Sequence, residues 1–127
     1  EKEKPYPDCP SGLPLIQHSL LLLLDFYREG QLTLETIVDK TSHSLARIYG
    51  IKDRGFIRED YWADLVLVDL NKNTTVTKDN LLYECAWSPF EGKTFNSLIN
   101  MTIINGELVY NHGKILTQPS GKKIEFE

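Results

Sequence analysis

Apolar residues recur with a helical period near the start of the chain. Residues 15–29 carry them around most of the circumference of a helix, including the run from Leu20 to Leu24, and Gly30 marks the end of the pattern. The prolines of residues 1–14 favour a loop before this helix. A helix that is apolar on nearly all sides is normally buried on nearly all sides, so we expect its partner surface to lie outside this sequence.

Two shorter helices are expected next. Thr33 is a good N-cap for a helix over residues 34–40, in which the apolar side chains share one face. A separate helix over residues 42–49 would begin at its own cap, Thr41 or Ser42. The first part of the chain is therefore predicted to be helical.

Beyond Gly50 the apolar period changes from helical to two, which is typical of strands. Residues 55–58 form one candidate short strand, and residues 74–77 form another. Residues 64–70 are apolar on both faces, so we expect a central strand that is covered on both sides.

A β-hairpin closes the predicted sheet. Asn105 and Gly106 favour a type I′ turn, residues 107–110 return as the partner strand, and residues 114–116 follow after a second turn. The tail, residues 117–127, is polar and is expected to be frayed or to form an edge strand. The alternating apolar side chains before the turn should point inward: Ile99, Met101 and Ile103.

The order of these elements indicates an α+β chain. A loop and helices come first, and about five short strands follow. This segregation is typical of an α+β domain, or of the end of one domain followed by a small β domain.

Composition narrows the class of protein. The chain has 127 residues, which suits one folded domain and is too short for an enzyme barrel of about 250 residues. Its net charge of −4 disfavours nucleic acid and anionic membranes as partners. The leucine run is far shorter than the roughly 18 apolar residues of a membrane span. Cys9 and Cys85 lack CxxC spacing and fit a reducing compartment, so a cytoplasmic protein is expected.

The three histidines predict no metal site and no catalytic residue. His18, His43 and His112 form neither an HxH nor an HExxH motif. We interpret His18 as a hydrogen-bonded core histidine, His43 as a local structural residue and His112 as a solvated side chain at a turn.

The carboxylates near the strongest strand have a simple interpretation. Asp60, Asp64 and Asp69 flank the apolar strand, where carboxylates commonly bind the amides of turns. A general acid–base pair would require them to converge in a cleft. Cys85 is expected to be a packed thiol.

Three stretches of the chain form a distinctive set: PSGLPLIQHSLLLLLDFY at residues 10–27, HSLARIYGIKDRGFIREDYWADLVLVDL at residues 43–70, and YECAWSPFEGKTFNSLINMTIINGELVYNHG at residues 83–113. Together, in order and spacing, they resemble the C-terminal third of cyclic amidohydrolases, and dihydroorotases most of all. The chain departs from the resemblance at Asp60, where many relatives have glycine in Gly-x-Asp-Ala-Asp-Leu, so the turn geometry there is in question.

The resemblance implies a metal-dependent (β/α)₈ barrel with an appended β-sandwich. Such an enzyme uses a metal-activated hydroxide, with zinc as the expected metal, to interconvert L-dihydroorotate and N-carbamoyl-L-aspartate in pyrimidine biosynthesis. Residues 1–50 would be the loop and closing helices of the barrel, and residues 51–127 would be part of the sandwich. The family's metal ligands correspond to sequence upstream of Glu1, so this chain alone should bind no metal and be inactive.

By the same resemblance, a loop of the chain would touch the substrate. The family places a Pro-x-Gly segment with its backbone against the substrate ring, and Pro10, Ser11 and Gly12 match that segment. A glycine lets a ligand approach the main chain closely, which suits this role. The alternative is that these residues only shape a turn.

The resemblance also implies partners. A small-molecule substrate and the missing N-terminal part of the same protein are expected, and self-association of the isolated chain is expected because its apolar surfaces would be uncovered. Two alternatives stay open: a segment of an allantoinase or dihydropyrimidinase, and a non-catalytic β-rich interaction module.

Overall fold

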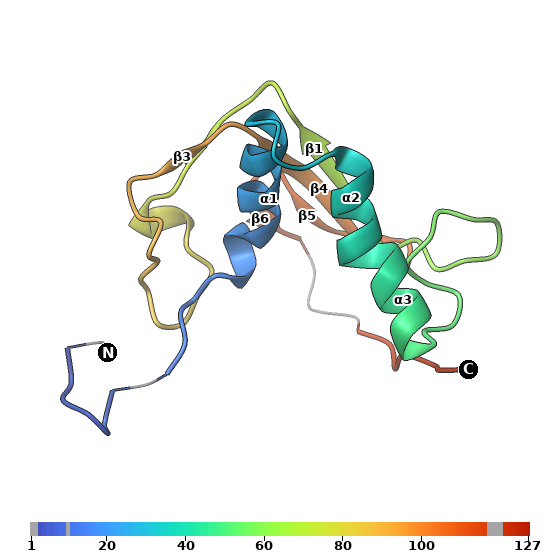
Figure 1. Ribbon diagram of the computed structural model, residues 1–127, viewed down its shortest axis with the longest axis horizontal. Coiled ribbons are helices and arrows are strands. Elements are labelled where there is room, and N and C mark those ends of the chain that lie inside the picture. The colour runs from blue at the N-terminus through green and yellow to red at the C-terminus, as the bar shows by residue number, and fades with distance from the viewer. Residues whose placement is uncertain (1–2, 10, 117–120) are drawn as a thin grey trace.

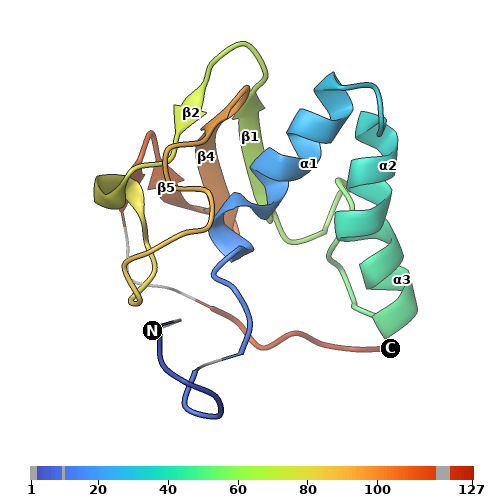
Figure 2. The same ribbon diagram turned by 60° about the vertical axis from the view of Figure 1, so that its left-hand side comes forward.

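The helical part of the chain begins with a short 3-10 turn that runs into a helix. The computed structural model describes residues 3–9, 11–116 and 121–127. In it, η1 (Ile16–His18) leads directly into α1 (Ser19–Arg28), which confirms the helix predicted over residues 15–29. Figure 2 shows α1 standing between a β-sheet and a second helical rod.

The burial of this first helix is one-sided. Leu21 and Leu24 are 4% exposed, whereas Ile16 is 86% exposed. Within the described residues, α1 is buried at Leu21, Leu24 and Asp25, so burial of its other sides by a surface outside this sequence stays a prediction.

The second and third predicted helices form one continuous rod. α2 (Leu34–Val38), η2 (Asp39–His43, a π-helical segment) and α3 (Ser44–Tyr49) follow one another without a break (Figure 1). The cap at Thr33 is confirmed, since its hydroxyl accepts a hydrogen bond from the Thr36 amide at 3.2 Å.

The predicted cap between the two helices is wrong. Neither Thr41 nor Ser42 starts a helix, because both lie inside the π-helical segment. The Thr41 hydroxyl instead donates to the Ile37 carbonyl at 2.8 Å, one turn earlier in the same rod. A π-helical turn absorbs an extra residue without ending the helix, so these polar residues need not act as caps.

The strands of the described residues form a four-stranded antiparallel sheet and a separate two-stranded ribbon. The larger sheet has the order β1-β4-β5-β6, and the ribbon pairs β2 with β3. The bounds of the six strands are β1 Leu65–Asp69, β2 Thr74–Thr75, β3 Thr94–Phe95, β4 Leu98–Ile104, β5 Glu107–Asn111 and β6 Lys114–Ile115. A further 3-10 turn, η3 (Lys78–Asn80), lies between β2 and β3.

The strand predicted over residues 64–70 is present, but its predicted central position is wrong. β1 lies at one edge of the described sheet, and Val66 and Leu67 are partly exposed on its two faces. The apolar run therefore indicates a strand whose two faces can both be covered, but it does not predict the position of that strand in the sheet.

The predicted hairpin is confirmed. β4 and β5 pair antiparallel around Asn105 and Gly106, whose φ values of 53° and 83° are those of a type I′ turn. The expected inward row is only partly right, because register shifts interrupt the alternation of β4 against both neighbouring strands. Ile99 packs against the core, whereas Met101 and Ile103 are half-buried outside that cluster.

Residues 55–58 form a loop, so the strand predicted there is wrong. Gly55 has a φ of 80°, which is incompatible with an extended strand, and the Phe56 ring stacks on His43 with centroids 4.4 Å apart. The tail prediction covers residues 117–120, which lie outside the described residues. Beyond them, Phe126 forms an isolated antiparallel bridge with Ile51, next to the end of α3.

The aspartates around β1 bind turn amides, as predicted for two of them. Asp64 accepts a hydrogen bond from the Asn105 amide at 2.8 Å and forms an ion pair with Arg54. Asp69 accepts from the Asn71 amide at 2.8 Å. Asp60 has a φ of 64°, so it occupies a left-handed turn position that glycine fills without strain.

The buried core joins α1 to the two-stranded ribbon. Leu21, Val76 and Phe95 form its centre, with Val76 at 1% and Phe95 at 0% exposure. Partly buried apolar side chains surround them: Leu22, Leu81, Phe90 and Ile99.

The loop after α3 generates a prediction about Gly55. A Cβ added there would lie 2.6 Å from the Ala46 Cβ and 3.1 Å from the Ser42 carbonyl oxygen. We expect Gly55→Ala to lower the free energy of unfolding by about 2–4 kcal/mol, because overlap adds to the cost of a positive φ. Gly92→Ala is the control, since Gly92 has a φ of 83° with no atom within 4 Å of an added Cβ. Urea denaturation of both variants measures the difference, and equal losses would contradict the close approach.

Candidate functional site

The loop that the resemblance assigns to substrate is open to solvent. Ser11 and Gly12 are exposed, Gly12 has a φ of 79°, and no atom lies within 4 Å of a Cβ built on Gly12. Pro10 lies outside the described residues. The backbone at Gly12 is therefore accessible, but the described part of the chain brings no other candidate side chain to it.

The loop joins the folded part of the chain at Gln17, a residue that sequence reasoning missed. The Gln17 amide donates to the Tyr83 hydroxyl at 2.8 Å. Its side chain donates from Nε2 to the Asn80 carbonyl at 2.8 Å and accepts at Oε1 from the Leu82 amide at 2.9 Å. The sequence signal that could have identified Gln17 is its position as a polar residue at the start of a leucine-rich helix. The pattern of residues does not predict that its hydrogen-bond partners lie in residues 80–83.

His18 is a core residue held among aromatic rings. It is 2% exposed and stacks on Phe95, with centroids 5.9 Å apart and an angle of 14° between the planes. Tyr83 and Phe90 approach edge-on at 6.1 Å and 5.9 Å. Burial lowers the pKa of His18, so the neutral imidazole is favoured.

His18 is predicted from the sequence to be hydrogen-bonded, and this prediction is wrong for its Nδ1 atom. Its Nδ1 is buried and has no hydrogen-bond partner among the described residues. The aromatic neighbours explain this, because rings fill the surroundings of the imidazole without offering a strong donor or acceptor.

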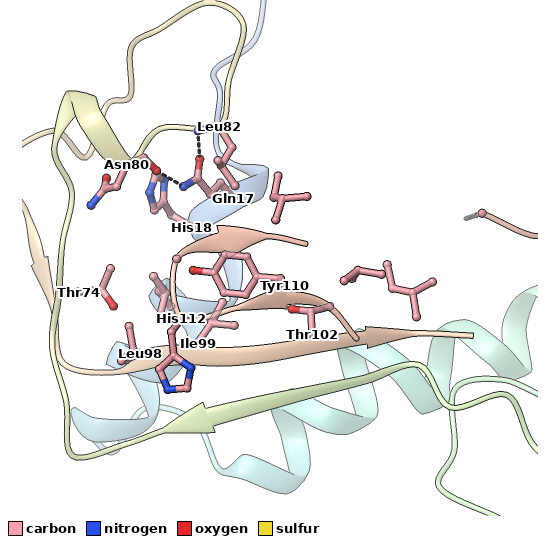
Figure 3. Close-up of a pocket in the computed structure, with 16 residues that line it drawn as sticks. Gln17, His18, Thr74, Asn80, Leu82, Leu98, Ile99, Thr102, Tyr110 and His112 are labelled. Carbon is pink, nitrogen blue, oxygen red and sulfur yellow. Dashed lines mark hydrogen bonds between the residues drawn. The ribbon is translucent and has the colours of Figure 1, made fainter. Parts of the chain in front are cut away.

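A large apolar pocket lies between the start of α1 and strands β4 and β5 (Figure 3). Its volume is about 740 Å³. His18 and Leu21 line it from the helix, and Ile99 and Tyr110 line it from the strands. Most of the lining is apolar, so the pocket suits an apolar group, and His18 and His112 are the histidines that line it.

Within the described ranges, no group of three or more His, Cys, Asp or Glu side chains could hold a metal ion. His43 is occupied by its stack on Phe56, which supports a local structural role. His112 is exposed, as predicted, and its Nδ1 lies 2.5 Å from the Asn111 side-chain oxygen. Cys9 and Cys85 are not joined by a disulfide. Among the described residues, the helices are too short or too polar for a membrane span.

Comparison with known proteins points to one family. The sequence profile of the amidohydrolase family matches residues 22–110. The chain is 36% identical to the dihydroorotase of Pyrococcus furiosus over 114 residues, which are 90% of this chain and 27% of that enzyme. It is also 36% identical to an allantoinase of Desulfitobacterium hafniense over 103 residues, which are 81% of this chain and 23% of that enzyme.

A solved structure supports the same kinship. An L-hydantoinase (dihydropyrimidinase) from Arthrobacter aurescens is similar with a TM-score of 0.78 and 25% identity, over 87% of this chain and 25% of that one. The chain therefore spans about a quarter of the length of the relatives that it matches.

The buried imidazole generates a prediction about pH. Because burial lowers the pKa of folded His18, the unfolded chain takes up a proton first as the pH falls below about 6.5. Stability should therefore fall with decreasing pH between about 7 and 5, with a slope from His18 of at most about 1.4 kcal/mol per pH unit. His18→Phe should remove this part of the slope.

Thermal unfolding at several pH values measures the effect. His112→Gln is the control, since that histidine is exposed and its replacement should leave the slope unchanged. The same slope in the original chain and in His18→Phe would show that His18 titrates alike in both states.

Proposed function

The chain belongs to the amidohydrolase family, and from that premise we propose that it forms the C-terminal part of a dihydroorotase. The proposed activity is the hydrolysis of L-dihydroorotate to N-carbamoyl-L-aspartate and its reversal in pyrimidine biosynthesis. The observation that carries the proposal is the 36% identity to a dihydroorotase across 90% of this chain, although the match covers 27% of that enzyme.

We also propose a division of the chain at residue 50. Residues 1–50 would belong to the closing loop and helices of a catalytic barrel, and residues 51–127 to a β-sandwich. In the described part of the chain, all three α-helices come before all six strands, and this order supports the division. So does the exposure of Ile16 and Ile48 on the helices, because helices of a barrel cover its strands with apolar side chains.

The described residues do not fit a catalytic metal. Zinc in an enzyme site usually takes three protein ligands, and no such group of side chains is present in the described part of the chain. In the proposed enzyme, zinc would therefore be held by residues outside this chain.

The proposed role of the chain itself is to bind and orient the substrate. Backbone carbonyls of Pro10, Ser11 and Gly12 and the backbone amides of Ser11 and Gly12 would contact the polar edge of the dihydroorotate ring. The open space at Gly12 and its φ of 79° support this role, since a side chain there would keep a ligand away from the main chain. Main-chain groups orient a ligand at little entropic cost when the loop is held in one conformation.

The second candidate function is that of an allantoinase or dihydropyrimidinase. The 36% identity to an allantoinase over 81% of the chain favours it specifically. These enzymes differ from dihydroorotases in substrate, so activity assays separate the candidates. A non-catalytic module is the third reading, and it predicts no activity with any of these substrates.

Two further properties belong to the proposal. A cytoplasmic location suits Cys9 and Cys85, which form no disulfide. Self-association of the isolated chain is supported by large exposed apolar side chains, among them Ile16, Ile48 and Ile57.

The proposed function is tested with the whole protein and with this chain alone. The full-length protein that carries the chain should hydrolyse dihydroorotate in preference to allantoin and dihydrouracil, and it should retain zinc after dialysis. The isolated chain should retain no stoichiometric zinc and show no turnover above a protein-free control. Preference for allantoin or dihydrouracil would reassign the substrate, and inactivity of the full-length protein would favour the non-catalytic reading.

The substrate loop generates a separate prediction. In the full-length protein, Gly12→Val should raise KM for dihydroorotate about tenfold and change kcat less, because the added side chain blocks binding to the backbone. Gly113→Val is the matched control, since Gly113 has a φ of 87° and equally open surroundings. Steady-state kinetics of both variants measures the effect. Unchanged kinetics in Gly12→Val would reduce residues 10–12 to an ordinary turn.

A further inference from the structure

We propose that Gln17 is a positioning residue that fixes the substrate loop in place, an inference that rests on the proposed function. Gln17 follows Gly12 by five residues and stands at the first ordered turn of the helical region. It joins the loop to residues 80–83, which are distant in the sequence but adjacent in the fold.

Gln17 holds this segment at three points. Its backbone amide donates to the Tyr83 hydroxyl, and its side-chain amide donates to the Asn80 carbonyl, both at 2.8 Å. The side-chain oxygen accepts from the Leu82 amide at 2.9 Å, as Figure 3 shows beside the bond to Asn80. A primary amide can donate and accept at once, so an apolar or acidic side chain cannot reproduce both bonds.

Residues 80–83, to which Gln17 is bonded, are themselves held by further contacts. The Asn80 side chain accepts from the Thr77 amide at 3.0 Å and donates to the Thr75 carbonyl at 2.7 Å. Tyr83 also packs edge-on against the His18 ring at 6.1 Å. Gln17 is therefore bonded to a part of the structure that is anchored to β2 and to the aromatic core.

The described contacts place the anchor of the loop at this point. No atom lies within 4 Å of a Cβ added at Gly12, whereas the His18 amide closes a turn onto the Leu15 carbonyl at 3.1 Å. Pro14 fixes one backbone dihedral between Gly12 and that turn. Gly12 is thus connected to Gln17 by four intervening residues, one of them the proline Pro14.

This arrangement predicts an effect on substrate binding. A displacement of a binding group by about 1 Å can weaken a productive contact about a hundredfold. Gln17 itself would touch no substrate, so its loss should act through the loop. The effect should appear in KM, because a loop that only binds substrate contributes equally to the ground state and the transition state.

The test is Gln17→Ala in the full-length protein. We expect KM for dihydroorotate to rise about tenfold while kcat changes by less than about twofold, at a temperature well below the unfolding transition. Gln31→Ala is the matched control, since Gln31 is exposed and its side chain bonds only to Glu29 among the described residues. That variant should keep both constants.

A second measurement uses the chain as it is. Tyr83→Phe keeps the ring against His18 and removes the acceptor of the Gln17 amide. Amide hydrogen exchange at Gln17 should accelerate at least tenfold relative to the unsubstituted chain. The Val76 amide, which donates to the Lys93 carbonyl at 2.9 Å, should stay protected.

The outcomes separate this inference from the proposed function. If the unsubstituted full-length protein does not act on dihydroorotate, the proposed function is overturned, and the positioning role falls with it. If that protein is active and Gln17→Ala keeps its KM, the positioning role alone is overturned. Unchanged exchange at Gln17 in Tyr83→Phe would overturn the anchoring itself, whatever the enzyme's substrate.

Discussion

The burial of one face of α1 against the ribbon of β2 and β3 is the constraint on which the described fold depends. Phe95 is completely buried and stacks on His18, and Leu21 and Val76 complete the contact. Burial of one such large side chain contributes about 1.5–3 kcal/mol. Asp25 adds a polar tie on the same face, accepting from the Asn96 amide at 3.1 Å and lying 3.3 Å from the Lys93 ammonium. A buried carboxylate is tolerated there because both of its oxygens have partners.

A second tie connects the far end of the helical region to the end of the chain. The Gly50 carbonyl accepts from the Glu127 amide at 2.8 Å, and the Lys52 amide donates to the Glu125 carbonyl at 2.9 Å. Gly55 packs close to α3 in the same region. The helical part is therefore held at two separated places, at α1 by the ribbon and after α3 by residues 125–127. The contacts of Gln17 with residues 80–83 depend on the packing of α1 against the ribbon, because Asn80 bonds to β2 and Tyr83 packs against the buried His18 ring.

Local chemistry made part of this structure predictable. Thr33 caps its helix and Asn105 starts its turn because both effects depend on residues within one turn of the chain. The interactions that fix tertiary structure were not predictable in this way. The partners of Gln17 lie more than sixty residues away, as do those of Asp25, and neither residue has a distinctive neighbourhood in the sequence. The edge position of β1 was equally hidden, because an apolar strand looks the same from the sequence at the edge or the centre of a sheet.

The candidate site at residues 10–12 is even harder to predict from the sequence than the tertiary contacts. A site built from backbone amides and carbonyls leaves almost no signature in the sequence, since every residue offers those groups. The structural feature that would mark such a site is a glycine with a positive φ and open surroundings. Gly12 shares both properties with Gly92 and Gly113. Geometry therefore cannot single out Gly12, and only the resemblance to a family does. The equal identity of 36% to a dihydroorotase and to an allantoinase fits this picture. Main-chain groups carry little sequence-specific information, so identity over this segment alone does not separate the two kinds of relative.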